Sequence, residues 1–222
     1  MLRLHFHPSP NPMKAALALE ELGLRYEPVP VDTFRGEQHE ARFLALNPNA
    51  KVPVLEDGEA VVFDSNAILL HLAEREGRLL PAGGSARAAA LSWLCFVATG
   101  LSPFSGQAVH FLHMCPEDLP YAKNRYVREV RRHYDVMDER LGREAYLGGA
   151  DYSIADIAAW GWIGFADMIA EGGVSGWPHL SRWFDAVSGR EAVARALALK
   201  ERFSLKREID EQTRRALFPS NY

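Results

Sequence analysis

The first part of the chain alternates short hydrophobic runs with longer amphipathic stretches. Runs of a few apolar or β-branched residues between Gly and Pro predict strands, and apolar residues at a spacing of three and four predict helices. The predicted order is strand 2–6, helix 12–23, strand 26–31, a weaker helix 39–48, a hairpin over 51–63 and helix 65–77. This order predicts an α/β unit that ends in an antiparallel hairpin.

Local signals set the ends of these elements. Pro12 in the first turn and Gly23 after the last are typical of a helix start and stop. Helix 12–23 buries Ala15, Ala18, Leu19 and Leu22 in this interpretation, and Lys14, Glu20 and Glu21 lie on its solvent face. The prolines of residues 26–31 favour an edge strand, because proline cannot donate to a sheet ladder. Ser65 is the expected N-cap of helix 65–77.

Beyond residue 84 the strand signals disappear and helical periodicity continues. A long apolar helix follows, bent near Gly100 and Pro103, and then helices over 121–142, 151–170, 177–188 and 190–199. Ser153 and Asp156 in SIAD predict a capping box. The near-uniform apolarity around Trp160, Trp162 and Phe165 predicts a buried central helix. The interpretation is an α/β domain 1–78, a linker 79–84, an all-helical domain 85–205 and a charged, loosely packed tail 206–222.

Composition excludes several classes of protein. The 222 residues carry a net charge of −4 and contain 48% hydrophobic residues, as in an ordinary globular protein. Mild acidity argues against nucleic-acid or membrane binding, which rely on basic surfaces. No signal peptide and no uncharged apolar run of about 18 residues is evident. Two cysteines are too few for a disulfide framework and fit a reducing, cytoplasmic location.

Several motifs in this order resemble the cytosolic glutathione transferases. They are NPNAKVPVLEDG (47–58), VVFDSNAILLHLAE (61–74) and SIAD (153–156). Within that family, SPNPMK (9–14), SPFSGQAVHFLH (102–113) and LPYAKNRY (119–126) most resemble the bacterial nu-class, whose members often act as glutathione-dependent disulfide reductases. The resemblance implies a thioredoxin-like N-terminal domain, an all-helical C-terminal domain, glutathione as co-substrate and a homodimer.

The resemblance also implies a glutathione site in the first domain. A cis Val52–Pro53 bond would present the Val52 backbone to the cysteinyl part of glutathione, and the alternative is a simple turn proline. Ser65 would bind the γ-glutamyl carboxylate at a helix N-terminus and Asp64 its ammonium. Here the alternative is that Ser65 only caps the helix.

Three further residues are weaker candidates for glutathione contacts. Gln38 and Lys51 match positions near glutathione, Lys51 facing the glycyl carboxylate, although either residue is also compatible with plain solvent exposure. Arg132 would reach a glutathione carboxylate by resemblance, but it belongs to a helical stripe with Arg125 and Arg128, and such a stripe is usually solvated or acid-paired.

The loop HPSPNPMK (7–14) contains neither Cys nor Tyr, so the reactive sulfur would be that of glutathione. A thiol reacts as its thiolate, and hydrogen-bond donors at a helix N-terminus favour that anion. Ser9 and Asn11 are the candidate donors, and which of them contacts the sulfur stays open. The thiolate would attack an electrophilic carbon or a disulfide. Pro10, Phe104, Phe111 and Phe165 are candidates for the apolar wall around that second substrate.

Three further possibilities concern a metal site, a reactive cysteine and a role without catalysis. His110, His113 and Cys115 fall within six residues but match no strong zinc spacing, so no metal is predicted. Cys95 and Cys115 lie in the helical domain, far in sequence from the thiol loop, and neither is a candidate mixed-disulfide cysteine. A non-enzymatic binding module with this fold remains an alternative, although such modules usually lose the acid–Ser pair or the activating loop.

Overall fold

The computed structural model describes residues 1–221, and the chain divides into two compact units. The first unit combines Met1–Leu72 with the segment from Ala194 onward, and the second is Ala73–Val193. The C-terminal segment therefore belongs to the same unit as the N-terminal residues.

The first unit is built on a four-stranded mixed sheet in the order β2-β1-β3-β4. Its strands are β1 (Leu2–Phe6), β2 (Tyr26–Pro30), β3 (Val54–Asp57) and β4 (Ala60–Phe63). β1 runs parallel to β2 and antiparallel to β3, with Leu4 paired to Pro28 and to Leu55. β2 is an edge strand, as its prolines predict. Leu4 and Phe6 on the central strand have no exposed surface.

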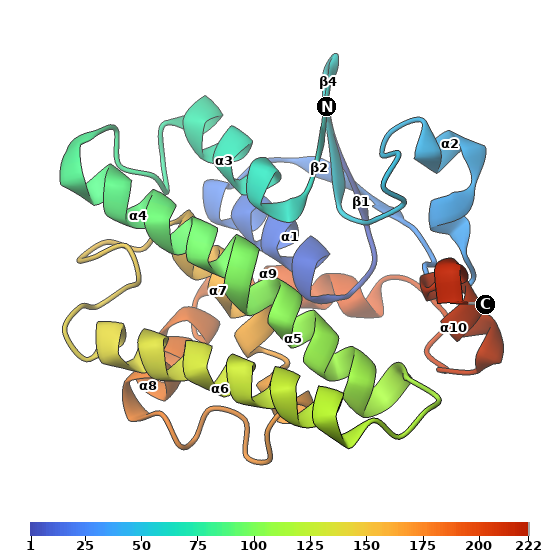
Figure 1. Ribbon diagram of the computed structural model, residues 1–222. Coiled ribbons are helices and arrows are strands. Elements are labelled where there is room, and N and C mark those ends of the chain that lie inside the picture. The colour runs from blue at the N-terminus through green and yellow to red at the C-terminus, as the bar shows by residue number, and fades with distance from the viewer. Residues whose placement is uncertain (222) are drawn as a thin grey trace. The chain divides into compact units, whose positions relative to one another are not determined.

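Helices cover both faces of this sheet. The helices α1 (Pro10–Leu22) and α3 (Ser65–Glu76) lie on one side and the short α2 (Ala41–Leu44) on the other (Figure 1). α1 ends where Gly23 adopts φ 68° and its N–H donates to the carbonyl of Glu20, a conformation that a Cβ would strain. The weak helix expected over 39–48 forms only over four residues, preceded by the 3-10 turn Glu37–His39.

The C-terminal segment, which the sequence predicted to pack loosely, forms a short helix and is hydrogen-bonded to the first unit, although most of its residues are exposed. After α9 (Glu191–Ala198), residues 199–210 lead to α10 (Glu211–Leu217), in which the carbonyl of Ala216 contacts the side chains of Gln38 and His39 in the turn before α2. Asp210 caps α10, its carboxylate accepting from the Thr213 N–H at 2.8 Å, and Thr213 is fully buried. The Asp210 side chain thus satisfies one backbone N–H of the first turn and marks the start of the helix.

The second unit is entirely helical. It contains α4 (Gly84–Phe96), α5 (Ser102–Val109), α6 (Pro120–Leu141), α7 (Ile154–Ile163) and α8 (Pro178–Ser188). α7 is buried along its whole length and packs against α4, α5 and α8. The predicted capping box is present, with the Ser153 N–H bound to Asp156 Oδ2 at 3.0 Å. The sheet domain and the helical domain together confirm the predicted fold class.

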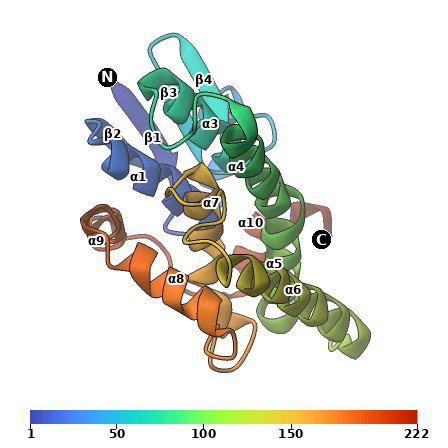
Figure 2. The same ribbon diagram turned by 90° about the vertical axis from the view of Figure 1, so that its left-hand side faces the viewer.

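α4 and α5 form one continuous helical rod, joined by the π-helical segment Val97–Leu101 (Figure 2). The rod ends in a second π-helical segment, His110–Met114. Gly100 lies in the first of these segments, where a Cβ would collide with Nε2 of His133 on α6, so only glycine permits this approach. Gly84–Met114 is long and apolar enough to cross a membrane by length and composition alone, contrary to the sequence interpretation. Core helices of soluble proteins pass the same test.

Candidate functional site

The loop after β1 places Ser9 and Asn11 at the start of α1. Ser9 is the N-cap residue, with extended backbone, and its carbonyl accepts from the Met13 N–H at 3.2 Å. Its hydroxyl lies 3.5 Å from the carbonyl of His7, the limit for a hydrogen bond. Asn11 lies in the first turn and is half-buried. The first turn carries no acidic side chain, so the positive end of the helix dipole is not offset there.

The Val52–Pro53 peptide bond is cis, which is the geometry expected for the segment before β3. The carbonyl of Lys51 accepts from Asn47 Nδ2 at 2.6 Å, so the backbone just before the cis bond is fixed from inside the loop. The Val52 side chain packs against the buried cluster of Val31, Phe43 and Val54. The Lys51 side chain is exposed.

Asp64, and not Ser65, is the side-chain cap of α3. Its Oδ1 accepts from the backbone N–H groups of Asn66 at 2.8 Å and Ala67 at 3.2 Å, and its φ is 72°. The expected N-cap therefore lies one residue earlier. Ser65 becomes the first helical residue and is buried, 3% exposed. Because Asp64 performs the capping, capping does not explain a hydroxyl at Ser65.

Lys14 was predicted on the solvent face of α1, and this is wrong. The residue has no exposed surface, because α1 is covered on nearly every side. Burial lowers its pKa from 10.5 to about 7, and the negative charge of Asp64 works in the opposite direction. The sequence did contain a sign of burial, because Lys14 is the one charged residue in the apolar run MKAALAL (13–19). Helical periodicity nevertheless placed it on the solvent face.

Gln38 is not a solvated surface residue. Its side chain is 3% exposed, and Nε2 donates to the carbonyl of Ala216 on α10 at 2.9 Å. Its Oε1 is buried and has no partner among the described residues. His39 contacts the same carbonyl through Nε2 at 2.8 Å. The C-terminal segment thus holds the loop that contains Gln38.

His7 is a buried residue that sequence reasoning did not consider. Its Nδ1 lies 3.3 Å from the carbonyl of Val31, and its ring stacks on Phe34 with centroids 5.1 Å apart. Burial lowers its pKa. A neutral imidazole therefore lies two residues before Ser9.

In the second unit, Arg132 projects from α6 with its side chain half exposed. Its guanidinium binds Glu129 Oε1 at 2.7 and 3.0 Å, and this bond together with Arg125 lowers the Glu129 pKa to about 2. Arg132, Glu129 and Arg125 line an open hollow of about 360 Å³ along α6, together with Tyr121, Asn124 and Arg128. The acid-paired stripe that the sequence suggested is present.

Of the four candidates for the apolar wall around the second substrate, Phe104 and Phe111 lie near the same aromatic ring. Phe111 stacks on Tyr126 with centroids 5.2 Å apart, and Phe104 lies 6.1 Å from the same ring. Phe165 follows α7, and its N–H donates to the carbonyl of Trp162. Pro10 belongs to the first unit, at the start of α1.

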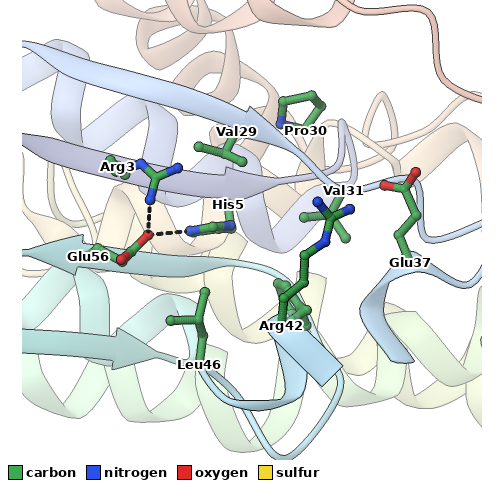
Figure 3. A pocket seen from close by; sticks show the side chains of 10 residues that line it. Arg3, His5, Val29, Pro30, Val31, Glu37, Arg42, Leu46 and Glu56 are labelled. Carbon is green, nitrogen blue, oxygen red and sulfur yellow. Dashed lines mark hydrogen bonds and ion pairs between the residues drawn. The ribbon is translucent and has the colours of Figure 1, made fainter. Parts of the chain in front are cut away.

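A separate cavity of about 290 Å³ lies in the first unit and contains none of the candidate residues. Figure 3 shows its lining, in which Glu56 accepts from Arg3 at 3.0 Å and from His5 at 2.6 Å. Arg42 at its rim pairs with Glu40 at 2.6 Å. These charges are mutually compensated. Within residues 1–221 no cluster of three or more His, Cys, Asp or Glu side chains has a metal-holding arrangement.

In the first unit, three candidate segments adjoin strands of the same sheet: the start of α1 follows β1, the cis-proline loop precedes β3, and the start of α3 follows β4. This arrangement offers hydroxyl and amide donors at two helix N-termini, which suits an anionic ligand. Lys14 on α1 lies near enough to Asp64 for their charges to interact.

Comparison with known proteins identifies the family. Residues 2–74 match the N-terminal domain of glutathione S-transferases, and residues 120–186 match their C-terminal domain. The chain is 40% identical to the disulfide-bond oxidoreductase YfcG of Escherichia coli over 204 residues, covering 89% of this chain and 94% of that protein. It is 35% identical to YghU of the same organism, a second disulfide-bond oxidoreductase, over 87% of this chain and 73% of that protein.

Solved structures agree. A glutathione transferase family member from Pseudomonas fluorescens, with two glutathiones bound, matches with a TM-score of 0.83 and 32% identity over 88% of this chain and 92% of that one. A Pseudomonas putida glutathione transferase, with one glutathione disulfide bound per subunit, has a TM-score of 0.81 and 30% identity over 88% and 90%. The chain therefore belongs to the glutathione S-transferase family.

Proposed function

We propose that this protein binds glutathione, activates its thiol as the thiolate and uses it chiefly in thiol–disulfide exchange. The single observation that carries the choice of reaction is the similarity, over nearly its whole length, to the disulfide-bond oxidoreductase YfcG. The α1 start supports the activation step, because it offers donors and an uncompensated helix dipole but no protein thiol.

The residues of the first unit take distinct roles in this proposal. Asn11 and Ser9 donate hydrogen bonds to the sulfur and so lower the thiol pKa. The Val52 backbone, ahead of Pro53, pairs with the cysteinyl part of glutathione. Ser65 binds the γ-glutamyl carboxylate at the start of α3, and Asp64 attracts the ammonium.

The remaining candidates are proposed to contact other parts of glutathione or the second substrate. Gln38 contacts glutathione, Lys51 pairs with the glycyl carboxylate, and Arg132 supplies a cation for a glutathione carboxylate. Phe104, Phe111, Phe165 and Pro10 are proposed to contact the second substrate.

The exchange proceeds in two balanced steps. The glutathione thiolate attacks one sulfur of the substrate disulfide, a new S–S bond forms, and the other substrate sulfur leaves as a thiolate that takes up a proton. A second glutathione thiolate then attacks the glutathione sulfur of the mixed disulfide and releases the second substrate thiol. Two glutathiones are oxidised to glutathione disulfide and one substrate disulfide is reduced. Two glutathiones are bound in the Pseudomonas fluorescens relative.

Attack on an electrophilic carbon is the second candidate, because it needs the same thiolate and several structural relatives are named glutathione transferases. A non-enzymatic binding role is the third. Asp64 and Ser65 are in place and the activating loop carries two donors, which weighs against a decayed site.

We also propose a cytoplasmic homodimer. Ala88, Ser92, Cys95 and Thr99 form an exposed face of small side chains along the α4–α5 rod, at spacings of four, three and four residues. Only 33% of the most apolar 18-residue window of that rod is buried within the chain. A second copy packed on this face would cover it.

The test begins with glutathione binding by calorimetry, since no saturable binding would exclude both enzymatic proposals. Parallel assays with bis(2-hydroxyethyl) disulfide and a chloronitrobenzene then separate exchange from transfer, and we expect the larger kcat/KM with the disulfide. Asn11→Ala should lower kcat about 10²-fold, as removal of one key donor to a developing anion does, and should cost more than Ser9→Ala. The reverse order would assign the sulfur contact to Ser9.

A further inference from the structure

The C-terminal segment is attached to both ends of the loop that precedes α2. At the start of this loop, the backbone N–H of Lys206 donates to Oδ2 of Asp32 at 2.9 Å. At its end, the carbonyl of Ala216 on α10 accepts from Nε2 of Gln38 at 2.9 Å and lies 2.8 Å from Nε2 of His39. The loop is therefore held between two contacts with one segment of the same unit.

The two polar atoms of the Gln38 amide have different surroundings. The side chain is 3% exposed, and Nε2 is the atom bound to the Ala216 carbonyl. This bond fixes which way the amide faces, because the flipped amide would place two acceptor oxygens against each other. Oε1 is left buried and without a partner among residues 1–221. A buried amide oxygen in that state lowers stability until a donor reaches it.

Contacts within and around α10 fix the position of the Ala216 carbonyl. Oδ1 of Asp210 accepts from the Thr213 N–H at 2.8 Å, and the Thr213 hydroxyl donates to the Glu208 carbonyl at 2.7 Å. Gly36, with φ 87°, brings the loop backbone against the helix, and a Cβ at this position would lie 3.6 Å from the Cβ of Ala216. α10 is therefore seated directly on the loop that contains Gln38.

Glutathione carries few N–H donors, and the proposed function assigns most of them. Its ammonium goes to Asp64, and its cysteinyl amide pairs with the Val52 backbone. The glycyl amide N–H is the donor that remains. A buried acceptor on Gln38, a residue already proposed to contact glutathione, suits this donor, because a hydrogen bond made away from water is electrostatically stronger.

We propose that α10 is a positioning element for glutathione. Through the Ala216 carbonyl it holds the Gln38 amide with Oε1 turned toward the ligand, where Oε1 accepts the glycyl amide N–H. The inference rests on the proposed function and extends it to a helix that makes no ligand contact of its own. α10 docking and glutathione binding then stabilise each other, because coupling between two sites is reciprocal.

Leu217→Pro tests the role of α10. The residue before a proline is disfavoured in the helical region, so this change moves the Ala216 carbonyl. We expect the glutathione Kd, measured by calorimetry, to rise about tenfold, the effect of one lost hydrogen bond. In a Gln38→Leu background the same change should alter Kd by no more than about twofold, because the Gln38 contact is already absent.

Glu211→Pro is the matched control. It introduces proline at the first position of the same helix, where proline is tolerated, after Asp210 in an extended conformation. It should leave the glutathione Kd within about twofold of wild type. The control ligand is γ-glutamylcysteine, which lacks the glycyl residue, and Leu217→Pro should change its Kd by no more than about twofold.

Hydrogen exchange on the wild-type protein gives a measurement that does not depend on the folding of a variant. Glutathione should slow exchange of the α10 amides, and γ-glutamylcysteine should not, because only the ligand with a glycyl amide favours the docked helix.

Two outcomes would overturn the inference and leave glutathione binding standing. Faster exchange of α10 with glutathione would mean that the helix covers the site and competes with the ligand. An equal rise in Kd with Leu217→Pro in both backgrounds would mean that α10 does not act through Gln38 and that water satisfies Oε1. A wild type without saturable glutathione binding would instead refute the proposed function, and this inference with it.

Discussion

Lys14 is a residue whose burial in the fold lowers the stability of the native state when its amine is protonated. It lies fully buried on α1, three positions after Asn11, and its charge interacts with that of Asp64. Burial disfavours the protonated amine, and the negative charge of Asp64 only partly compensates, so the pKa falls to about 7. The shift from 10.5 corresponds to an upper limit of about 5 kcal/mol of native-state cost at low pH.

The sign of the pH dependence follows from proton binding. Between about pH 7 and 10.5 the unfolded chain keeps the Lys14 proton and the native protein has lost it, so the free energy of unfolding rises with pH in that window. Lys14→Met should raise this free energy at pH 6.5 by a few kcal/mol and flatten the rise. Urea unfolding at half-unit pH steps measures both effects.

Lys51→Met is the control, because Lys51 is exposed and its replacement should leave the slope unchanged. If Lys14→Met proved less stable than wild type at pH 6.5, the ammonium of Lys14 would be a net stabilising partner of Asp64, and the burial argument would fail.

At the scale of elements, Asp156 holds together parts of the second unit that are distant in sequence. Its Oδ2 accepts from the Ser153 N–H, and its Oδ1 accepts from the Leu147 N–H at 2.9 Å and from Trp183 Nε1 on α8 at 2.8 Å. The capping box therefore joins the start of α7 to a preceding loop and to a neighbouring helix.

Asp156→Ala should lower the free energy of unfolding by about 3–5 kcal/mol, because it strands several buried donors at once. Ser153→Ala, which removes only the conventional cap, should cost about 1 kcal/mol. Chemical denaturation followed by circular dichroism compares the two variants. Equal losses would mean that the contacts with Leu147 and Trp183 contribute nothing.

The sequence predicted elements better than it predicted their surroundings. The strands, the SIAD cap and the end of α1 at Gly23 follow from local rules, and the structure confirms them. Lys14 was misplaced because periodicity locates one buried face and cannot show that α1 is covered on the other. Ser65 was taken for the cap because Asp and Ser both cap well and stand side by side. The docking of α10 onto Gln38 links residues 178 positions apart, which no local pattern records.

At the scale of the whole molecule, the exposed face of the α4–α5 rod bears on assembly. Ser92 Oγ donates to the Ala88 carbonyl and Thr99 Oγ1 to the Cys95 carbonyl, each at 2.8 Å. The polar groups of this face are thus satisfied within the helix. Small side chains with no unsatisfied hydroxyl allow close packing against a second apolar surface.

We therefore expect the wild-type protein to sediment as a dimer at micromolar concentration and Ser92→Arg to sediment as a monomer, because the arginine would have to be buried against the partner copy. Ser220→Arg makes the same change at an exposed position outside the rod and should remain dimeric. A wild-type monomer would refute the homodimer. A dimeric Ser92→Arg would place the interface on another face, and the partly exposed apolar rod would then need a different partner.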